Sequence, residues 1–386
     1  MSRFPPVEHP FWHTPFFQQP NAKHGKNAYP PTYMQQLSYR MPAEWEPQWG
    51  VQLTWPHEQT DWKPYLQDIT HTYIEMAKAI AQREKLLIVA PSVQAVEALL
   101  RHQVNMGNVV FHECPTNDTW ARDYGFITLV GQQGETAAKL LDFCFNGWGE
   151  KFEASKDNAI NRSLFDCLSR QMSIEKPACL AYEDHLDFVL EGGSIESDGA
   201  GTVFTTTGCL MAPHRNQPLS KSQIEQQLIQ RLHAQRVMWI DEGHLEGDDT
   251  DGHIDTLVRI APNDTLLYIY TDDVEDVHYA DLKAMEEQLK SFRTTKGDPY
   301  RLLRLPLPKA IYDDGERLPA TYANFLVING AVLVPTYQQP ELDRQAISVI
   351  QQAFPGHEMI PIDSLTIIRQ HGSIHCCTMQ FPKIPL

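Results

Sequence analysis

Short apolar segments alternate with amphipathic segments along the chain from about residue 40 onward, and this pattern constrains the fold more than any other feature. The apolar runs are rich in β-branched and aromatic side chains, which favours strands. They predict strands at 86–90, 109–113, 126–130, 140–145, 203–206, 237–240, 256–260, 266–270, 302–305, 325–328, 332–335, 359–362 and 374–379. Apolar residues at helical spacing predict helices at 63–83, 93–104, 157–170, 220–233, 277–293 and 341–353. The sequence therefore predicts a sheet-rich α/β fold.

The predicted helices recur roughly every 60 to 70 residues, which indicates about five comparable units and not two separate domains. Ser155 and Ser220 stand just ahead of two of these helices and are predicted N-terminal caps. The sequence has no glycine-rich phosphate-binding run of the dinucleotide or P-loop type. We therefore do not expect a phosphate-bearing cofactor.

The balance of charged residues restricts the partners of the protein. The formal net charge is −17, and Lys and Arg do not cluster, so nucleic-acid partners are not expected. An acidic protein favours a cationic substrate, although acidic residues also serve solubility alone. The seven cysteines form no Cys-x-x-Cys pair, which favours reduced thiols over a disulfide framework or a zinc ribbon.

The N-terminal segment 1–35 is dense in Pro, His and aromatic residues and has no regular period. We predict an extended arm that packs on the body or on a neighbouring subunit, so a homodimer stays open. The segment lacks the apolar run and cleavage site of a secretory signal, and no stretch of 18 apolar residues occurs in the chain. These features predict a cytoplasmic protein without a membrane partner.

Ionisable residues gather at four places that follow or begin predicted strands. The first, 117–125, combines the π-face of Trp120 with the carboxylate of Asp123. A planar cation such as guanidinium stacks on such a ring and donates paired hydrogen bonds to such an acid. An internal ion pair between Arg122 and a neighbouring aspartate is the alternative.

The second place, 188–194, has Glu191 at the end of an apolar run, before two glycines that permit a close backbone approach. A carboxylate at a buried strand end has a raised pKa unless it is paired, so Glu191 can exchange protons or hold a cation. A solvated glutamate in a turn is the alternative.

The third place, 247–256, is an acidic loop that opens the predicted strand 256–260. It does not fit a calcium loop, because the first and last carboxylates are missing when Gly252 takes the sixth position. In strand geometry His253 and Asp255 point to the same face, where the His can shuttle protons and the Asp can orient it or bind substrate. A structural His-x-Asp is the alternative.

The fourth place, 372–380, contains the neighbouring Cys376 and Cys377. Strand alternation places Cys376 opposite His375 and Cys377, so only one cysteine faces a given cleft. A buried cysteine is usually inert, and a reactive one needs a nearby His or cation that stabilises the thiolate. The four places together supply a Cys, a His, two Asp and a Glu, which suits nucleophilic hydrolysis of an amidine. A papain-like protease is disfavoured, because its nucleophile begins a helix near the N-terminus.

Motifs spread over most of the chain resemble those of the agmatine deiminase and bacterial peptidylarginine deiminase family, in the guanidine-modifying pentein superfamily. They occupy 41–47, 55–56, 120–123, 190–194, 250–255, 322–326 and 374–376, in the family's order. The resemblance implies a five-bladed α/β propeller of pseudo-repeated ββαβ units around a central channel. It also implies a single catalytic domain, 36–386, after the arm 1–35.

The resemblance further implies hydrolysis of a small cationic guanidine, with agmatine giving N-carbamoylputrescine and ammonia through a covalent thiouronium on cysteine. No metal or organic cofactor is implied. The implied roles are nucleophile for Cys376, general acid and base for His253, guanidinium clamps for Asp123 and Asp255, an assisting carboxylate for Glu191, a pocket wall for Trp120 and a distal-amine site for Asp249.

Two segments depart from the family pattern and bear on the substrate. The family's Gly-Gly-Gly-Asn before Ile-His-Cys is replaced at 370–373 by Gln-His-Gly-Ser, and the turn 337–344 lacks the family's Gly-Asp. Arginine or peptidylarginine is therefore an alternative substrate. An amidinotransferase, which passes the amidino group to an amine, and a binding protein with an inactive site also stay open.

Overall fold

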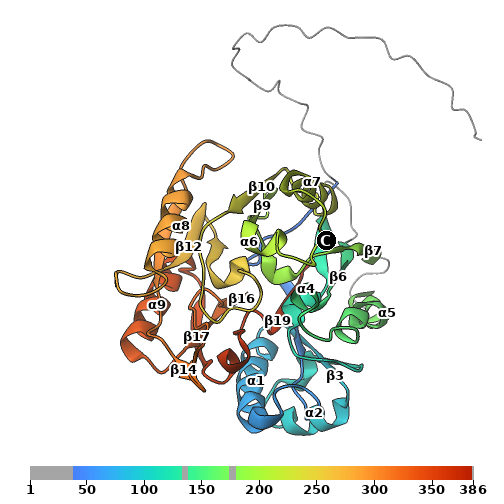
Figure 1. The fold of residues 1–386 in the computed structure, drawn as a ribbon. Helices are drawn as coiled ribbons and strands as arrows, with labels where there is room; N and C mark the ends of the chain where they lie inside the picture. Colours follow the sequence, from blue (N-terminus) through green and yellow to red (C-terminus); the bar gives the residue numbers. More distant parts are fainter. Residues whose placement is uncertain (1–37, 133–137, 174–179, 385–386) are drawn as a thin grey trace, which may run out of the picture. The chain divides into compact units, whose positions relative to one another are not determined.

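One structural unit is repeated five times in residues 38–132, 138–173 and 180–384, which the computed structural model describes (Figure 1). In each unit a first strand pairs antiparallel with a second, and a helical crossover leads to a third strand parallel to the second. This repetition agrees with the five comparable units expected from the sequence. The predicted arm 1–35 lies outside the described residues.

Three units follow one another in the middle of the chain, each with its crossover helix. The first has β5 (Ile127–Gly131), β6 (Ala138–Cys144), α5 (Ile160–Ser173) and β7 (Leu180–Val189), with β1 (Tyr39–Arg40) at its edge and the short α4 (Gly147–Glu150) after β6. The second has β8 (Ile195–Ser197), β9 (Thr202–Thr206), α6 (Thr207–Leu210), α7 (Lys221–Arg231) and β10 (Arg236–Ile240). The third has β11 (Val258–Ala261), β12 (Thr265–Tyr270), α8 (Tyr279–Ser291) and β13 (Arg301–Pro306).

The fifth unit is built from both ends of the described chain. The fourth, before it, has β16 (Leu326–Ile328), β17 (Ala331–Thr336), α9 (Pro340–Ala353) and β18 (Glu358–Asp363), and a small hairpin of β14 (Tyr312–Asp313) and β15 (Glu316–Arg317) precedes it. In the fifth, β19 (Thr378–Pro382) pairs antiparallel with β2 (Gln48–Thr54), followed by α1 (Leu66–Ala81), β3 (Lys85–Ala90), α2 (Val93–Leu100) and β4 (Val109–Glu113). The C-terminal strand thus completes a sheet that begins near residue 48.

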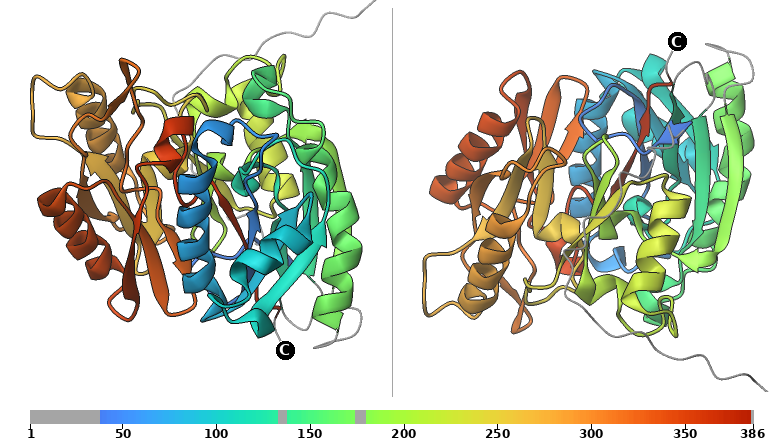
Figure 2. Two further views of the ribbon diagram at one scale, coloured as in Figure 1. Left: turned by 90° about the horizontal axis from the view of Figure 1, so that it is seen from below. Right: turned by 90° about the horizontal axis from the view of Figure 1, so that it is seen from above.

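Burial explains why these segments are strands. All seven residues of β2 are buried, as are nearly all of β3, β12 and β17. Such strands have parallel neighbours and lie inside the fold, so they read as continuous apolar runs and not as alternating ones. The crossover helices α1, α5, α7, α8 and α9 lie at the periphery, outside their sheets (Figures 1 and 2).

Neighbouring sheets contact one another through two first strands at two joints and through a first and a second strand at a third. Contacts join β19 to β5, β8 to β11, and β16 to β2. At the last of these joints the turn between β16 and β17 carries Asn329, whose side chain exchanges two hydrogen bonds of 3.0 and 2.9 Å with the backbone of Gln48. The backbone N–H of Asn329 also donates to Glu84 Oε2 at 2.8 Å. The fourth and fifth units are therefore joined by polar contacts as well as apolar packing.

Most predicted strands and helices are confirmed, but two strand predictions are wrong where they begin. Predicted strand 374–379 begins only at Thr378, because 372–377 forms a turn in which the Asn324 side chain accepts from two backbone N–H groups. Predicted strand 256–260 begins only at Val258, after a 3₁₀ turn at Ile254–Thr256. Strands β2 and β7 were not predicted.

The helix ends test two predicted caps. Ser220 caps α7 with a full capping box, in which its side chain and that of Gln223 each accept a backbone N–H at the helix start. Ser155 is not a cap: the helical segment there begins after Lys156, without a side-chain cap. Within the described parts of the chain no helix has the length and apolarity to cross a bilayer.

Glu84 makes stability depend on pH. Burial raises its pKa to about 7, although the hydrogen bond from Asn329 acts in the opposite direction. The folded state therefore holds a proton that the unfolded state loses near pH 4.5, so this stability is present below about pH 4.5 and is lost as pH rises through 7. Glu84→Gln should stabilise the protein at pH 8 relative to wild type by on the order of 2 kcal/mol, and by much less at pH 5.

Chemical unfolding of both proteins at the two pH values measures this difference. Glu75→Gln, at a partly exposed position of α1, is the matched control, and the pH-dependent gain must be absent from it. An equal effect of Glu84→Gln at both pH values would contradict the prediction.

Candidate active site

A short turn stands before the first strand of each unit, and these five turns carry the polar groups of the site. The predicted residues are thereby brought together from distant parts of the sequence. The turns are α3 (Ala121–Tyr124) with Trp120 before β5, Glu191 with the 3₁₀ turn Gly192–Ser194 before β8, His253 with Ile254–Thr256 before β11, Asn324 before β16, and His375 with Cys376 before β19.

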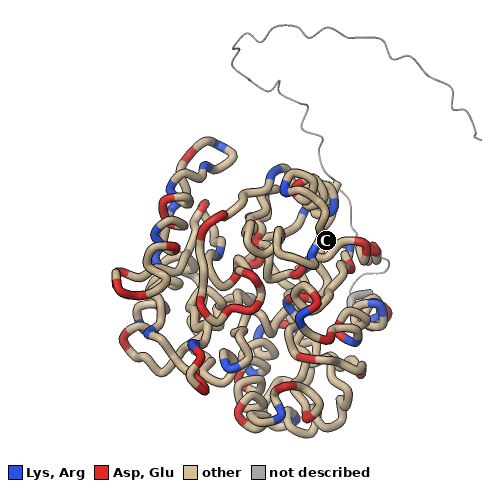
Figure 3. The backbone as a smooth tube through the Cα atoms, in the orientation of Figure 1, with Lys and Arg blue, Asp and Glu red and all other residues tan. Residues whose placement is uncertain are grey.

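A cavity of about 420 Å³ is lined by residues of two of these turns, those of Trp120 and Cys376. Acidic and aromatic side chains dominate its lining, and Asp and Glu gather on the neighbouring loop 241–251 (Figure 3). The lining includes the predicted Trp120, Asp123, Asp249 and Cys376, together with Asp61, Asp118, Trp148, Phe152, Thr250, Arg369, Gln370, His371 and Gly372.

Cys376 lies at the cavity and is 5% exposed. Asn324 Nδ2 donates to its sulfur at 3.2 Å, and Asp255 Oδ2 lies 3.8 Å from the same atom. Burial raises the pKa of the thiol well above its usual 9.0, and the charges of Asp255 and Asp123 raise it further. The sequence predicted a nearby His or cation that stabilises the thiolate. The nearby carboxylates instead favour the neutral thiol. Cys377 is fully buried and packs away from the cavity, as expected.

His253 is completely buried between two carboxylates. Its Nε2 lies 3.1 Å from Glu191 Oε2, and its Nδ1 lies 3.6 Å from Asp123 Oδ1. Burial alone would lower its pKa, but Asp123, Cys209 and Glu191 together raise the pKa well above 6.5. The ring is therefore an imidazolium at neutral pH, able to give up a proton. The prediction that His253 and Asp255 share a strand face was wrong, because both lie in a turn, yet both reach the site.

Glu191 is held in its ionised form by its partners. Arg215 Nε donates to Glu191 Oε1 at 2.9 Å, and His253 Nε2 contacts Glu191 Oε2. Burial opposes ionisation, but the hydrogen bond and charge of His253 and the charge of Arg215 lower the pKa below its usual 4.5. Of the possibilities drawn from the sequence, a paired carboxylate that holds a cation agrees with these contacts, and a solvated turn does not. Glu191 instead orients and stabilises the imidazolium.

Asp123 is anchored by neutral donors. Trp148 Nε1 donates to Oδ2 at 3.0 Å and the backbone N–H of Gly193 donates to Oδ1 at 3.1 Å. Burial raises its pKa to about 6 despite the opposing charge of His253. Gly193 is required here, since a Cβ at that position would lie 2.6 Å from His253 Nδ1 and 2.8 Å from Asp123 Oδ1.

Asp255 is fully buried, and its two carboxylate oxygens have different surroundings. Its Oδ2 accepts from His375 Nδ1 at 2.7 Å. Burial opposes its ionisation, but His375 lowers its pKa below the usual 3.8. Within the described residues, Asp255 Oδ1 and His253 Nδ1 are buried and have no hydrogen-bond partner. Buried polar atoms without partners are costly, so these two atoms are suited to polar groups of a ligand.

Trp120 and the segment before Cys376 form one wall. The Trp120 indole donates to Asp118 Oδ2 at 3.0 Å, and a Cβ on Gly372 would lie 2.2 Å from the ring. His371 has a φ of 64°, a conformation that glycine adopts most easily, and its Nδ1 contacts the Gly247 carbonyl at 2.6 Å. This contact compensates the replacement of glycine by His371 in the segment that departs from the family.

Asp249 is half-buried in the cavity lining. Burial raises its pKa, and Asp248 adds to the effect while His371 opposes it. Trp120, Asp123, Asp249 and Cys376 thus line one cavity, and side-chain contacts link His253 to Asp123, Glu191 to His253 and Asp255 to Cys376.

Sequence reasoning gave no role to Asn324, Trp148, Arg215 or His375, although all four contact predicted residues. For Asn324 and His375 a signal existed, because both stand inside the motifs 322–326 and 374–376. Trp148 and Arg215 lie outside every quoted motif.

Two groups of buried side chains have donor atoms close enough together to hold a metal ion: Glu191, Cys209 and His253, and Glu44, Glu196 and His375. In each group an arginine already pairs with a carboxylate, Arg215 in the first and Arg259 in the second. A metal ion is therefore not needed to balance the charge of either group.

Comparisons with known proteins agree with this arrangement. The model of the Porphyromonas-type peptidyl-arginine deiminase family matches residues 40–382. A putative agmatine deiminase of Legionella pneumophila is 35% identical, over 91% of this chain and 98% of that protein. The crystal structure of a putative arginine deiminase from Porphyromonas gingivalis has 46% identity and a TM-score of 0.82, covering 89% of this chain and 98% of that one. A variant of the C. jejuni agmatine deiminase with substrate bound has 37% identity and a TM-score of 0.81, covering 91% and 98%. The chain belongs to the Porphyromonas-type peptidyl-arginine deiminase family.

Proposed function

We propose that the protein hydrolyses the guanidinium group of agmatine to give N-carbamoylputrescine and ammonia. The observation that carries this proposal is the convergence of one thiol, two carboxylates and an imidazolium, from Cys376, Asp123, Asp255 and His253, at one end of an acidic cavity. Proteins that are 35% and 33% identical to this chain bear the names putative agmatine deiminase and agmatine deiminase.

The first half of the reaction uses the charge of the substrate. A guanidinium held by Asp123 and Asp255 offsets the carboxylates that raise the pKa of Cys376. The thiol then loses its proton to bulk water, because Asp255, whose pKa is lowered, is too weak a base to take it. The thiolate then attacks the guanidinium carbon, and the His253 imidazolium protonates the departing amine. Ammonia leaves, and a thiouronium remains on Cys376.

The second half of the reaction restores the enzyme. Neutral His253 takes a proton from water, and the resulting hydroxide attacks the thiouronium carbon. The C–S bond breaks, the hydroxyl proton of the adduct passes to the sulfur, and the neutral ureido product leaves with Cys376 restored as a thiol. Glu191 and Arg215 stay in place and stabilise the imidazolium at both ends of the cycle.

The distal part of the cavity bears on which guanidine is preferred. Asp249, Asp61 and Asp118 favour a cationic amine such as that of agmatine. Arg369 and His371 line the same cavity and favour a carboxylate, so arginine is the second candidate substrate. Ureido product and ammonia from agmatine, arginine and a peptidylarginine, each measured without an added amine, separate these candidates. Ammonia formation excludes an amidinotransferase, and no product from any of the three would refute the hydrolase.

We also propose that the five units form a five-bladed α/β propeller, with the five turns at its central channel. The same order of strands in every unit and the contacts between first strands support this arrangement. Residues 36–386 would then act as one catalytic domain.

Removal of the nucleophile tests the assignment of Cys376. Cys376→Ser should lower kcat for agmatine by about a thousandfold or more, because a hydroxyl does not replace the thiolate in the covalent step. Cys377→Ser is the matched control next to it and should retain most of the activity. Similar kcat values for the two variants, measured as ammonia release, would contradict the assignment.

The raised pKa of Cys376 predicts slow alkylation of the free protein. The rate of reaction with iodoacetamide should keep rising above pH 9, because the thiolate fraction is still growing there. Mass spectrometry of the peptide that contains Cys376 measures the rate, with Cys114 as an internal reference outside the cavity lining. A rate that reaches its plateau below pH 8 would show a stabilised thiolate instead.

Neutralising Asp249 tests the distal site. Asp249→Asn should raise KM for agmatine by about tenfold and change kcat much less, because the proposed contact of the residue is with the distal amine and not with the guanidinium. KM for arginine should rise less. Asp272→Asn, which removes the same charge at an exposed position outside the cavity lining, controls for net charge. An unchanged KM for agmatine would assign Asp249 to the loop alone.

A further inference from the structure

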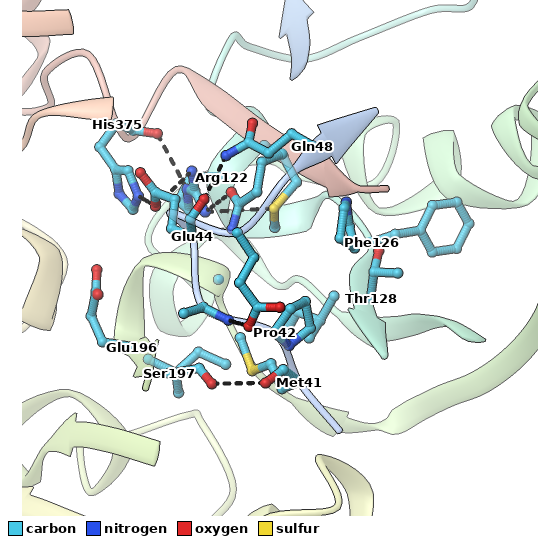
Figure 4. A pocket seen from close by; sticks show the side chains of 18 residues that line it. Met41, Pro42, Glu44, Gln48, Arg122, Phe126, Thr128, Glu196, Ser197 and His375 are labelled. Carbon is cyan, nitrogen blue, oxygen red and sulfur yellow. Dashed lines mark hydrogen bonds and ion pairs between the residues drawn. The ribbon is translucent and has the colours of Figure 1, made fainter. Parts of the chain in front are cut away.

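A second set of buried charged side chains lies next to the turn of Cys376 and takes no direct part in the proposed reaction. Several of them line a small cavity of about 40 Å³, and Figure 4 shows them from close by. They come from units that are distant in sequence. The set consists of Glu44, Arg122, Glu196, Arg259 and His375.

His375 joins this set to the reaction cavity. Its Nδ1 lies 2.7 Å from Asp255 Oδ2, and its Nε2 lies 2.6 Å from Glu44 Oε2. A neutral imidazole has only one N–H, whereas both of these contacts are to carboxylate oxygens, which accept. Both contacts are hydrogen bonds only if the ring is an imidazolium, whereas a neutral ring protonated on Nδ1 would accept from Arg259 Nη2, 3.1 Å from Nε2. Burial acts against ionisation of Glu44, but Arg259 and His375 lower its pKa below the usual 4.5, so its oxygen stays an acceptor.

An imidazolium at His375 makes the numbers of cations and carboxylates in the set and Asp255 equal. Three carboxylates are buried, those of Glu44, Glu196 and Asp255. The opposing cations are Arg122, Arg259 and His375. Within this set His375 is the cation that pairs directly with Asp255, so loss of its charge would leave the Asp255 carboxylate without a partner from the set.

We propose that His375 is a positioning residue, whose imidazolium holds Asp255 Oδ2 between the reaction cavity and Glu44 so that Oδ1 is fixed toward the guanidinium. The proposal rests on the proposed hydrolysis of a guanidine and adds a residue to it. With Oδ2 held by His375, Asp255 cannot rotate without breaking a buried charge-assisted hydrogen bond. A fixed carboxylate binds a planar cation with less loss of freedom than a mobile one.

The contact between His375 and Asp255 is called the clamp below. Glu44 and Arg259 connect this clamp to the neighbouring turns. Glu44 Oε1 accepts from the Val327 amide at 2.7 Å, and Arg259 Nη2 donates to Glu44 Oε2 at 2.9 Å. Arg259 Nη1 also donates to the Ala323 carbonyl at 3.1 Å, next to the Asn324 that contacts Cys376. The clamp is thus held by the turns of Asn324 and Cys376, which form the remainder of the site.

The pH profile separates positioning from a merely structural role. In His375→Gln the amide can keep one hydrogen bond but carries no charge, so the pKa of Asp255 should rise. In wild type the acid limb of kcat/KM is set by Asp123, whose pKa is about 6. Loss of the charge in contact with the buried Asp255 should raise its pKa above that of Asp123, so the acid limb should move up by about one pH unit, and kcat/KM for agmatine at pH 7 should fall about twofold from this ionisation alone. Charged groups that face Asp255 or His375 are His253, Asp123, Arg259, Arg122, Glu44 and Glu196.

A matched control separates this effect from a general loss of stability. Glu286→Gln removes a buried carboxylate that bonds Tyr268 and Arg304 on the sheet of the third unit. It should lower Tm without moving the acid limb. A His375→Gln variant that also lowers only Tm, with the acid limb and KM of wild type, overturns the proposal.

Two further measurements keep the proposal testable. If His375→Gln does not fold, Glu44→Gln decides, because it weakens the same clamp. A smaller upward shift of the acid limb supports positioning, and no shift overturns it.

If wild type converts no guanidine, the proposed function fails, and ¹⁵N NMR of histidine-labelled protein tests the clamp alone. Protons on both ring nitrogens of His375 at pH 7 support the clamp, and a single proton overturns it.

Discussion

Buried negative charge is the physical constraint on which the site depends. An ionised carboxylate without water destabilises the fold unless cations or N–H donors compensate it. Arg215 and His253 compensate Glu191, whereas Asp123 has only two neutral donors and a more distant imidazolium. This difference explains why the pKa of Glu191 is lowered and that of Asp123 is raised to about 6. Compensation is least complete where the proposed guanidinium lies.

The repeated unit explains how residues far apart in sequence meet at one place. Each first strand begins beside the first strand or turn of a neighbouring unit, so the residue just before it lies near its counterparts. Five such turns supply a thiol, an imidazole, an amide and carboxylates without a long catalytic loop. The backbone of each turn is fixed by the strand that follows it, and sites on rigid elements hold their geometry better than sites on free loops.

The sequence predicts the strands and helices well because their burial produces regular apolar runs. It predicts the turns poorly, because the turn of Cys376 is set by a single side chain, that of Asn324, more than 50 positions away. The turn of His253 and Asp255 was also not predicted. The sequence placed both residues on a strand face, whereas they reach the site from a 3₁₀ turn. Family motifs pointed to the proposed reacting residues regardless of local structure. Trp148 and Arg215 needed the structure, since nothing near them in the sequence indicates a contact with Asp123 or Glu191.

The raised pKa of Cys376 changes how its chemistry is understood. A thiolate stabilised in the free protein would be open to oxidation and alkylation at all times. A thiol held neutral by nearby carboxylates becomes nucleophilic only when a cation enters between them. On this view the carboxylates of Asp123 and Asp255 perform two tasks with one charge: they bind the guanidinium and keep the thiol inactive until it is bound. Selection for a cationic substrate then follows from charge balance as much as from the shape of the cavity, and a neutral molecule of similar size would leave the thiol protonated.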